Sequence, residues 1–535
     1  MTDVLVVGSG AGGVHAAWPL VERGLEVAML DYGNEDREYA SLVPSEPWLA
    51  LRTTDESQHR YLLGDRFEGI TLGGIRVGAQ LTPPRLFIPA DTERLTPVDS
   101  ATFSATESLA KGGLAAGWGA GVFPFDDADL AGAPISAADL APHYEAVAER
   151  IGVAGDDDDD LRPFLGECRA MMPAMAIDSG AERVMARYAA QRERLNAAGL
   201  FVGRTRLAAC TREHRGRGPH RYFDMDFWAD DRRAVYRPRW TLDELAAKDG
   251  FELRDRRLVS AFREDESGVV VTTTHADTGE REEHRARALV LAAGALGTVR
   301  IVLRSLDRYG TPVPILCNPY TYAPVLNVGM LGREARDERH SLAQLTAIYR
   351  PEAADGRIVQ AQYYSYRSLL LFKLMKEAPI GHREARAILR RLQPVLGILG
   401  IHHEDRPSAR KTCVLHRGPE GGPDRLAIDY RLDDAEALRH DREERRLFAL
   451  FRRLGCFALK RIRPGHGSAI HYAGTIPFGP EGKGLTCDRD CRVRGTRRVH
   501  LADGAVFPYL PAKGLTFTIM ANADRVGTLL ANELA

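Results

Sequence analysis

Residues 4–31 read VLVVGSGAGGVHAAWPLVERGLEVAMLD. The run Val4–Val7 is short, apolar and β-branched, as is typical of a buried parallel strand. A glycine-rich turn follows it, and the pattern then predicts a helix over 11–23 and a second strand over 26–30. The stretch therefore predicts a βαβ unit.

The turn has the form GxGxxG, which is informative because it lies between a strand and a helix. Gly8 allows the tight turn, Gly10 lets the backbone approach a pyrophosphate, and Gly13 lets the helix pack closely on the strand. Phosphates would then lie at the start of the helix, near Ala11, and Asp31 can accept hydrogen bonds from an adenosine ribose. We expect a dinucleotide in this groove.

Composition excludes several classes of protein. The chain has 535 residues and a formal net charge of −1, which gives no electrostatic argument for a nucleic-acid or membrane partner. No apolar run approaches the ~20 residues of a membrane span, and the N-terminus reads as a strand instead of a signal peptide. The seven cysteines form no CxxC pair, and free thiols are favoured at 487 and 491. The acidic run Asp156–Asp160 lacks the ligand spacing of a calcium loop and is interpreted as a solvated loop. We expect a cytoplasmic protein without a metal site.

Two further segments suit a bound cofactor. Residues 111–121, KGGLAAGWGAG, hold five glycines, which disfavours a helix and allows backbone to lie against a flat ligand. Residues 289–298, LVLAAGALGT, form a second junction of strand, glycine and helix.

Between 306 and 464 the sequence pattern is different. Segments in which apolar and polar residues alternate occur there with separate helices, which predicts an antiparallel sheet. The strands expected there are 342–349, 357–366, 395–403 and 425–430, and the helices are 368–376, 383–392 and 434–454.

These blocks, together with the C-terminal text, resemble the glucose–methanol–choline (GMC) oxidoreductases, which are FAD enzymes that oxidise alcohols. The C-terminal text comprises HYAGTIPFG at 471–479, RVRGT at 492–496, LADGAVFP at 501–508 and TFTIMANADR at 516–525. The resemblance implies an α/β fold with a discontinuous Rossmann-type FAD-binding domain and an α+β substrate domain on an antiparallel sheet. The segments expected for the FAD-binding domain are 1–130, 236–305 and 465–535; the substrate domain is 306–464, and 131–235 is a largely helical excursion.

The resemblance also implies residues that hold the cofactor. Asp503 corresponds to the family's flavin-contacting acid, and a final helix from Thr516 would point its positive end at the flavin ring. Where some relatives tether FAD through histidine, this chain has Ala116-Gly117-Trp118, so we expect FAD to be bound without a covalent bond. The cofactor-binding residues expected are Gly8, Gly10, Ala11, Gly13, Asp31, Gly113, Trp118, Ala293, Gly294, Asp503 and Thr516.

Alcohol oxidation needs a base, because the hydroxyl must lose its proton as hydride leaves the carbon for flavin N5, and histidine suits this task. The family places its active-site histidine where this chain has His471. His402 and His403 would point to opposite faces of a strand, so at most one reaches the pocket, and His466 is a weaker competitor.

The chain departs from the family just before the last helix. The family usually carries a second polar residue there, Asn or His, and this chain has Gly514 and Leu515. The neighbouring Lys513 could orient a substrate oxygen or stabilise reduced flavin, or could equally face solvent. We therefore count His471, Lys513 and Gly514 as the candidate catalytic positions.

The substrate is expected to be a small polar alcohol such as a sugar, aminosugar or polyol, with oxygen or another acceptor taking the electrons. Polar and aromatic side chains in the 306–464 region suit such a substrate. They are Gln344, Gln360, Gln362, Tyr364 and Tyr366, of which the last four share one face by period two unless that face is simply solvated. The alternatives are oxidation of a sterol-like alcohol, a non-redox flavin-bound lyase or decarboxylase, and a flavin-binding protein without catalysis.

Overall fold

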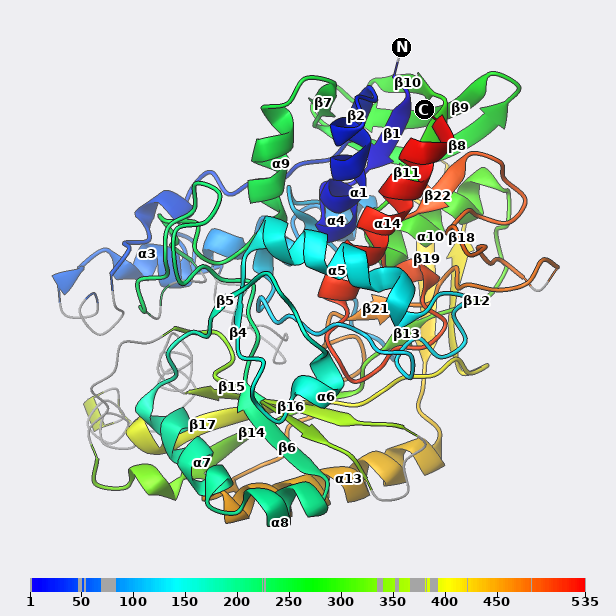
Figure 1. Ribbon diagram of the computed structural model, residues 1–535. Coiled ribbons are helices and arrows are strands. Elements are labelled where there is room, and N and C mark those ends of the chain that lie inside the picture. The colour runs from blue at the N-terminus through cyan, green and yellow to red at the C-terminus, as the bar shows by residue number, and fades with distance from the viewer. Residues whose placement is uncertain are drawn as a thin grey trace.

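The computed structural model places a parallel sheet at one end of the molecule and an antiparallel sheet at the other, with both termini at the parallel-sheet end (Figure 1). The described residues are 2–46, 51, 54–68, 83–223, 225, 228–333, 340–351, 356–365, 381, 383–384, 393–420, 422–482 and 484–534.

The parallel sheet is assembled from four distant parts of the chain. Its strands in spatial order are β22 (Val499–Leu501), β11 (Ala288–Leu291), β1 (Val4–Val7), β2 (Val27–Leu30) and β7 (Phe251–Arg254). Every neighbouring pair is parallel, and each residue of β11, β1 and β2 is buried, which explains their uninterrupted apolar text. The βαβ unit predicted at the N-terminus and the junction predicted near 289–298 are both confirmed.

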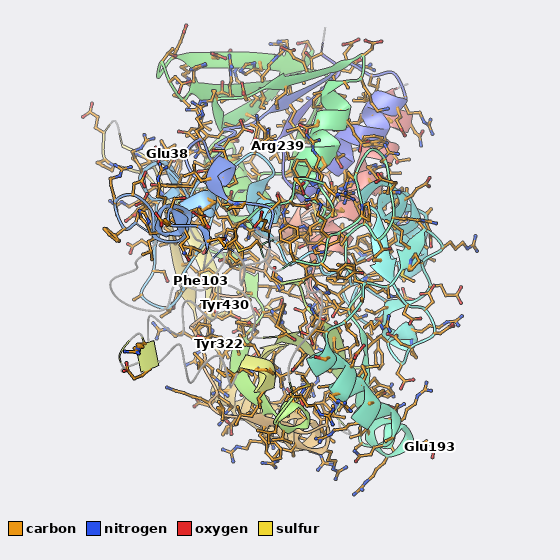
Figure 2. The ribbon with its side chains drawn as sticks, turned by 90° about the vertical axis from the view of Figure 1, so that its left-hand side faces the viewer. Glu38, Phe103, Glu193, Arg239, Tyr322 and Tyr430 are labelled. Carbon is orange, nitrogen blue, oxygen red and sulfur yellow. The ribbon has the colours of Figure 1, made fainter. Side chains whose placement is uncertain are left out.

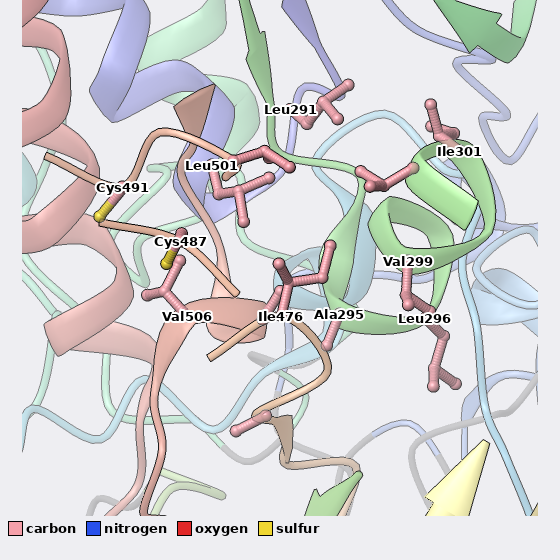
Figure 3. Close-up of a cluster of buried hydrophobic side chains, with 14 of the residues drawn as sticks. Leu291, Ala295, Leu296, Val299, Ile301, Ile476, Cys487, Cys491, Leu501 and Val506 are labelled. Carbon is pink, nitrogen blue, oxygen red and sulfur yellow. The ribbon is translucent and has the colours of Figure 1, made fainter. Parts of the chain in front are cut away.

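Helices cover both faces of the parallel sheet. On one face lie α1 (Ala11–Glu22), α9 (Pro238–Ala246) and α14 (Thr516–Leu534). The helices α1 and α14 run side by side, and a Cβ at Gly527 would lie 2.2 Å from the Ala16 carbonyl oxygen. On the other face α10 (Gly294–Ser305) packs its apolar side chains against β11 and β22, beside the buried thiols of Cys487 and Cys491 (Figure 3).

Antiparallel sheets make up most of the remainder. The six-stranded sheet has the order β20 (Cys456–Ala458), β14 (Tyr320–Asn327), β17 (Leu396–His402), β16 (Val359–Ser365), β15 (Leu345–Tyr349) and β6 (Leu200–Arg204). A three-stranded sheet has the order β10 (Arg281–Ala286), β9 (Gly268–His275) and β8 (Arg257–Asp265). A four-stranded sheet is mixed: β12 (Val313–Pro314), β18 (Lys411–His416) and β19 (Arg425–Tyr430) are antiparallel, and β3 (Val98–Asp99) pairs with β19 in parallel.

The segment 131–235 has more strand than the sequence pattern predicts. It holds α5 (Ala137–Ile151), α6 (Arg162–Leu165), α7 (Ser179–Ala189) and α8 (Arg192–Ala197), and also β4 (Val153–Gly155), β5 (Met171–Pro173) and β6. Because β6 pairs with β15, this segment supplies an edge of the six-stranded sheet. The helix predicted over 368–376 lies outside the described residues, as does most of the helix predicted over 383–392.

The six-stranded sheet has two different faces. One packs against α7 and α13 (Asp434–Arg453) through apolar residues such as Ala361, Leu399 and Ile401. Side chains alternate along a strand, so Gln360, Gln362 and His402 belong to the opposite face, which is turned toward the parallel-sheet end. The face expected to be polar is therefore an inner face, since Gln360 and Gln362 are buried.

A two-residue ladder joins the two ends of the molecule. β13 (Leu316–Cys317) pairs with β21 (Tyr472–Ala473) just before the chain enters β14. Behind this ladder the ring of Phe103 packs against those of Tyr430 and Tyr472, with centroids 5.5 and 5.4 Å away. Figure 2 shows Phe103 and Tyr430 above Tyr322, which lies on β14 of the six-stranded sheet. In the described part of the chain, no helix has the length and apolar character needed to cross a membrane.

The first glycine turn yields a matched pair of substitutions. A Cβ at Gly13 would lie 1.7 Å from the Gly8 carbonyl oxygen, whereas a Cβ at Gly10 would meet nothing closer than 3.8 Å. We expect Gly13→Ala to lower the free energy of unfolding by about 1–3 kcal/mol or more, as overpacking does, and Gly10→Ala to have a much smaller effect. Thermal or urea unfolding of the two variants measures this, and equal midpoints would contradict the packing role of Gly13.

Candidate active site

A cavity of about 820 Å³ lies where three helices begin. Its lining includes Gly10 and Ala11 at the start of α1, Ala293 and Gly294 at the start of α10, and Thr516 at the start of α14. Each helix start carries unpaired N–H groups and partial positive charge. The cavity therefore suits a large ligand that bears negative charge.

The GxGxxG turn leaves room for such a ligand at one position only. Gly8 has φ of +96°, which a side chain rarely adopts, and Gly13 lies under the turn and outside the cavity lining. Gly10, in contrast, faces a second glycine loop, with the nearest atoms of Gly112 and Gly113 lying 3.8 Å from its Cβ position. The three glycines thus fill the separate roles expected of a phosphate-binding turn.

Ser9 ties the turn to the end of the next strand. Its hydroxyl donates to Asp31 Oδ2 and accepts from the backbone N–H of Gly112 at 2.9 Å. Asp31 lines the cavity, and burial raises the pKa of its carboxyl to about 6. A ribose hydroxyl that donates to this carboxylate would compensate part of that cost.

Arg300 brings a buried guanidinium, which is ion-paired with Glu107, to the cavity wall. Its guanidinium is buried; Nη2 donates to the Thr96 carbonyl at 2.8 Å and approaches Glu107 at 3.1 Å. Its Nε and Nη1 have no hydrogen-bond partner among the described residues. Unpaired buried donors on a cation fit an anionic cofactor such as a dinucleotide.

Asp503 organises the opposite wall of the cavity. One carboxylate oxygen accepts from the Thr298 hydroxyl on α10, and the other accepts from the Ala505 N–H at 2.9 Å. Burial raises the pKa of this carboxyl to about 6. Asp503 therefore fixes the end of β22 relative to the 293–298 turn, while its side chain lines the cavity.

The cavity brings together most of the expected cofactor residues. Those in its lining are Gly8, Gly10, Ala11, Asp31, Gly113, Ala293, Gly294, Asp503 and Thr516. Trp118 is not in the lining: its indole N–H donates to the Tyr236 carbonyl at 2.8 Å, and its ring packs edge-on against the Tyr236 ring. The side chain of Trp118 thus braces the glycine loop.

His471 lies next to this cavity, between the two lining residues Ile470 and Tyr472. The antiparallel ladder of β13 and β21 pairs Leu316 with Ala473 and Cys317 with Tyr472, so the next positions to face each other are Asn318 and His471. Their side chains meet: His471 Nδ1 is 3.0 Å from Asn318 Oδ1.

Asn318 fixes the protonation pattern of this histidine. Its amide nitrogen donates to the carbonyls of His403 at 2.7 Å and Pro511 at 2.8 Å, so both amide hydrogens are used. The amide oxygen must face His471 and can only accept. His471 therefore carries its proton on Nδ1 and a free lone pair on Nε2.

The environment keeps His471 neutral. Burial lowers the pKa of its imidazole to about 4. The ring of His402 stacks on it with centroids 5.2 Å apart and an interplanar angle of 24°. Burial, followed by the charges of His471 and His403, also lowers the pKa of His402 well below its ordinary value. Both rings are neutral near pH 7, and His471 can accept a proton.

Gly514 and Lys513 have different surroundings although they are adjacent. A Cβ at Gly514 would lie 3.9 Å from His471 Cε1 and 3.2 Å from Phe123 Cδ2, so position 514 directly borders the histidine. The ammonium of Lys513 is buried, contacts Asp129, and donates to Asp126 at 3.1 Å and to the Phe164 carbonyl at 2.6 Å. This amine is occupied by protein acceptors.

The other histidines considered as the base lie in different environments. His402 and His403 lie on opposite sides of the sheet, since His402 stacks on His471 and packs at a tilt against Tyr320, whereas His403 stacks on His440 of α13. His466 packs against Tyr430, with centroids 4.8 Å apart. The sequence indicated His402 only weakly, and neither Asn318 nor Arg300 was indicated at all.

The polar residues expected on the six-stranded sheet lie in different environments. Gln344 Oε1 accepts from the Asp178 N–H at 2.9 Å and its amide nitrogen approaches His340, so this side chain is engaged in the fold. Tyr364 donates to Gln362 Oε1 at 2.9 Å on the inner face. Tyr366 lies outside the described residues.

Known proteins resemble this chain in sequence. A family model described as GMC oxidoreductase matches residues 435–523, which include His471 and Asp503. The 6'''-hydroxyparomomycin C oxidase of Streptomyces lividus is 26% identical over 100% of this chain and 92% of its own length. The paromamine 6'-oxidase of Streptomyces fradiae is 25% identical over 99% of this chain and 92% of its own length.

Solved structures share the fold. An FAD-dependent oxidoreductase from Chaetomium thermophilum superposes with a TM-score of 0.61 at 15% identity, covering 100% of this chain and 99% of that one. The pyridoxine 4-oxidase from Mesorbium loti superposes with a TM-score of 0.60 at 14% identity, with the same coverage. Together with the cavity and the histidine beside it, these matches support an FAD-dependent alcohol oxidoreductase of the GMC type.

Proposed function

We propose that this protein oxidises a hydroxyl-bearing carbon of a sugar-like alcohol to a carbonyl, with His471 as the base. The hydrogen bond from His471 Nδ1 to Asn318 Oδ1 carries the proposal, because it leaves Nε2 as a proton acceptor. An alcohol has a pKa far above neutrality, so a positioned acceptor must take its proton as hydride departs. Low pKa values at both His471 and His402 keep this acceptor free of a proton.

FAD is proposed to bind without a covalent bond in the cavity at the three helix starts. The GxGxxG turn and Arg300 would hold its phosphates, Asp31 a ribose, and Asp503 with Thr516 the flavin end. Bound FAD supplies the acceptor for the hydride that leaves the alcohol carbon. The positive end of α14 favours the negative charge that arrives with it.

The substrate class is inferred from the inner sheet face and from the relatives. Gln360, Gln362 and Tyr364 line one buried face, and the two curated relatives are named as oxidases of paromamine and hydroxyparomomycin C. A sterol-like alcohol would need an apolar face in this place. Both relatives are named oxidases, a term that implies oxygen as electron acceptor. Oxygen is therefore proposed to take the electrons from the reduced cofactor.

The proposed domain division separates the parallel sheet from the six-stranded sheet, whereas the four-stranded sheet crosses it, because β3 lies in 1–130 and pairs with β19 of 306–464. We propose an FAD-binding domain from 1–130, 236–305 and 465–535, and a substrate domain from 306–464. The pairing of β6 with β15 favours adding the strand Leu200–Arg204 to the substrate domain. In the rest of 131–235, α7 and α8 pack on the outer face of the six-stranded sheet, and α5 packs against α14.

The cofactor proposal makes a direct prediction. Purified protein should show the two visible absorbance bands of an oxidised flavin, and acid precipitation should release FAD into the supernatant, because residues 116–118 offer no imidazole for a tether. Recovery of NAD in place of FAD would exclude the proposed cofactor. A pellet that stays yellow would exclude non-covalent binding.

The base proposal predicts a large kinetic loss. His471→Ala should keep the fold and FAD but slow anaerobic flavin reduction by roughly 10²–10⁴-fold, the usual contribution of a positioned acid–base group. His466→Ala is the matched control and should stay within about tenfold of the parent. Since the His471 pKa is lowered to about 4, kcat/KM of the parent should fall only as the pH drops through about 4. An acid limb near 6.5, or a His471→Ala rate within about tenfold of the parent, would remove His471 as the base.

The positioning role of Asn318 can be separated from its structural role. Asn318 lies two residues before β14 and Asn327 is its last residue; both are buried, and Asn327 also donates to a backbone carbonyl, that of Gly180 at 2.8 Å. Asn318→Ala should lower kcat for flavin reduction by at least about tenfold with little change in KM, because His471 loses the partner that fixes its tautomer. Asn327→Ala should lower stability similarly and leave kcat near the parent value. A similar kcat in both variants would show that Asn318 only supports the fold.

A further inference from the structure

A row of three side chains crosses the inner face of the six-stranded sheet. Tyr320 on β14 pairs with His402 on β17, and His402 pairs with Gln360 on β16. Residues directly opposite in antiparallel strands project from the same face. The three side chains therefore lie next to one another, on the face opposite to the one that packs against α7 and α13.

One member of this row connects it to the proposed base. The His402 ring lies between two others, with its centroid 4.7 Å from that of Tyr320 and 5.2 Å from that of His471. Gln360 is the next position along the row on the far side of His402. A molecule held against His471 would therefore lie next to His402, and Gln360 is the next side chain of the row, one strand farther along.

Two polar atoms of the row have no partner. Gln360 Oε1 and His402 Nδ1 make no hydrogen bond among the described residues, although Gln360 is 1% and His402 9% exposed. Nearby polar side chains of the same face are paired, since Gln362 Oε1 accepts from Tyr364 and the Thr346 hydroxyl meets that of Thr205 at 3.0 Å. Buried polar atoms normally have partners, so two vacant ones beside a base point to a ligand.

The chemistry of the pair limits what it can bind. Burial lowers the pKa of His402 well below its ordinary value, so the ring is neutral and offers one donor and one acceptor nitrogen. Gln360 Oε1 only accepts. A group that donates to Gln360 and also bonds to a neutral imidazole is a hydroxyl or an amine. An anionic group cannot donate to Gln360.

We infer that Gln360 and His402 bind a second hydroxyl or amine of the substrate, close to the hydroxyl that is oxidised. This inference rests on the proposed function and adds to it a requirement for two polar groups on one molecule. It makes Gln360 a specificity-determining residue, and a simple alcohol without the second group should be a poor substrate.

The test uses methyl α-D-glucoside, its 2-, 3- and 4-deoxy analogues, and its 2-amino-2-deoxy analogue as probes. The parent holoenzyme should reduce its flavin anaerobically with the glucoside or the amino analogue, and kcat/KM should fall about tenfold or more for one deoxy analogue. Gln360→Met, which keeps the shape and removes the acceptor, should lose about the same factor on the full glycoside and nothing further on that deoxy analogue. Gln360→Glu, which keeps an acceptor oxygen, should recover part of the loss.

Thr346→Val is the matched control, because it removes a paired hydroxyl from the same sheet face and should leave all ratios between probes unchanged. A loss in Gln360→Met confined to the amino analogue assigns the pair to an amine, and a loss on the glucoside assigns it to a hydroxyl. An equal loss on every probe, or no loss, would overturn the inference while leaving the proposed function standing. Absence of flavin reduction by every probe in the parent would instead overturn the proposed sugar-like substrate.

Discussion

The short ladder between β13 and β21 is the constraint on which the active site depends. It sets Asn318 opposite His471, and it brings the start of the six-stranded sheet against the C-terminal segment. A buried carboxylate holds this ladder in place: Asp405 Oδ2 accepts from the Cys317 N–H and from the Tyr430 hydroxyl, both at 2.8 Å. Its other oxygen accepts from the buried ammonium of Lys411 at 2.7 Å. Loss of a partner in such a buried network leaves an unpaired charge, which costs more than the pair itself contributes.

The same arrangement explains how the chain can lack a polar residue at position 514. The Cβ position of Gly514 lies 3.9 Å from His471 Cε1 and 3.2 Å from the Phe123 ring, and the groups that contact the histidine ring come from elsewhere in the chain. Asn318 contacts Nδ1 from the entry to β14, and His402 covers a ring face from the end of β17. Both belong to the six-stranded sheet region, while His471 belongs to the C-terminal segment. The alignment of the proposed base, His471, therefore depends on the docking of these two regions, more than on the helix start alone.

Local patterns predicted the parts of the fold that local physics determines. The apolar run at 4–7 and the GxGxxG turn identify a buried parallel strand and a helix start without any distant contact. β14 was not predicted because Pro324 lies within it, and proline usually argues against an inner strand. Asn318 precedes Pro319 and reads as an ordinary turn residue, and its role arises only from a partner 153 positions away. Lys513 was a candidate because it adjoins position 514. Position 514 borders His471, however, whereas the Lys513 ammonium contacts Asp129 and the Phe164 carbonyl.

Stacking of two histidines also affects how a proton can be held. When His471 accepts a proton, the new cation lies against His402, whose own protonation is already disfavoured by burial and by the charge of His471. The two rings therefore cannot be charged together, and their titration belongs to the pair. His402 stays neutral whether or not His471 carries the proton, so its hydrogen-bonding nitrogens keep the same character on both sides of the proton transfer. In the proposed reaction, a recognition group with this property would hold the alcohol before hydride transfer and the carbonyl product after it without a change in its own charge.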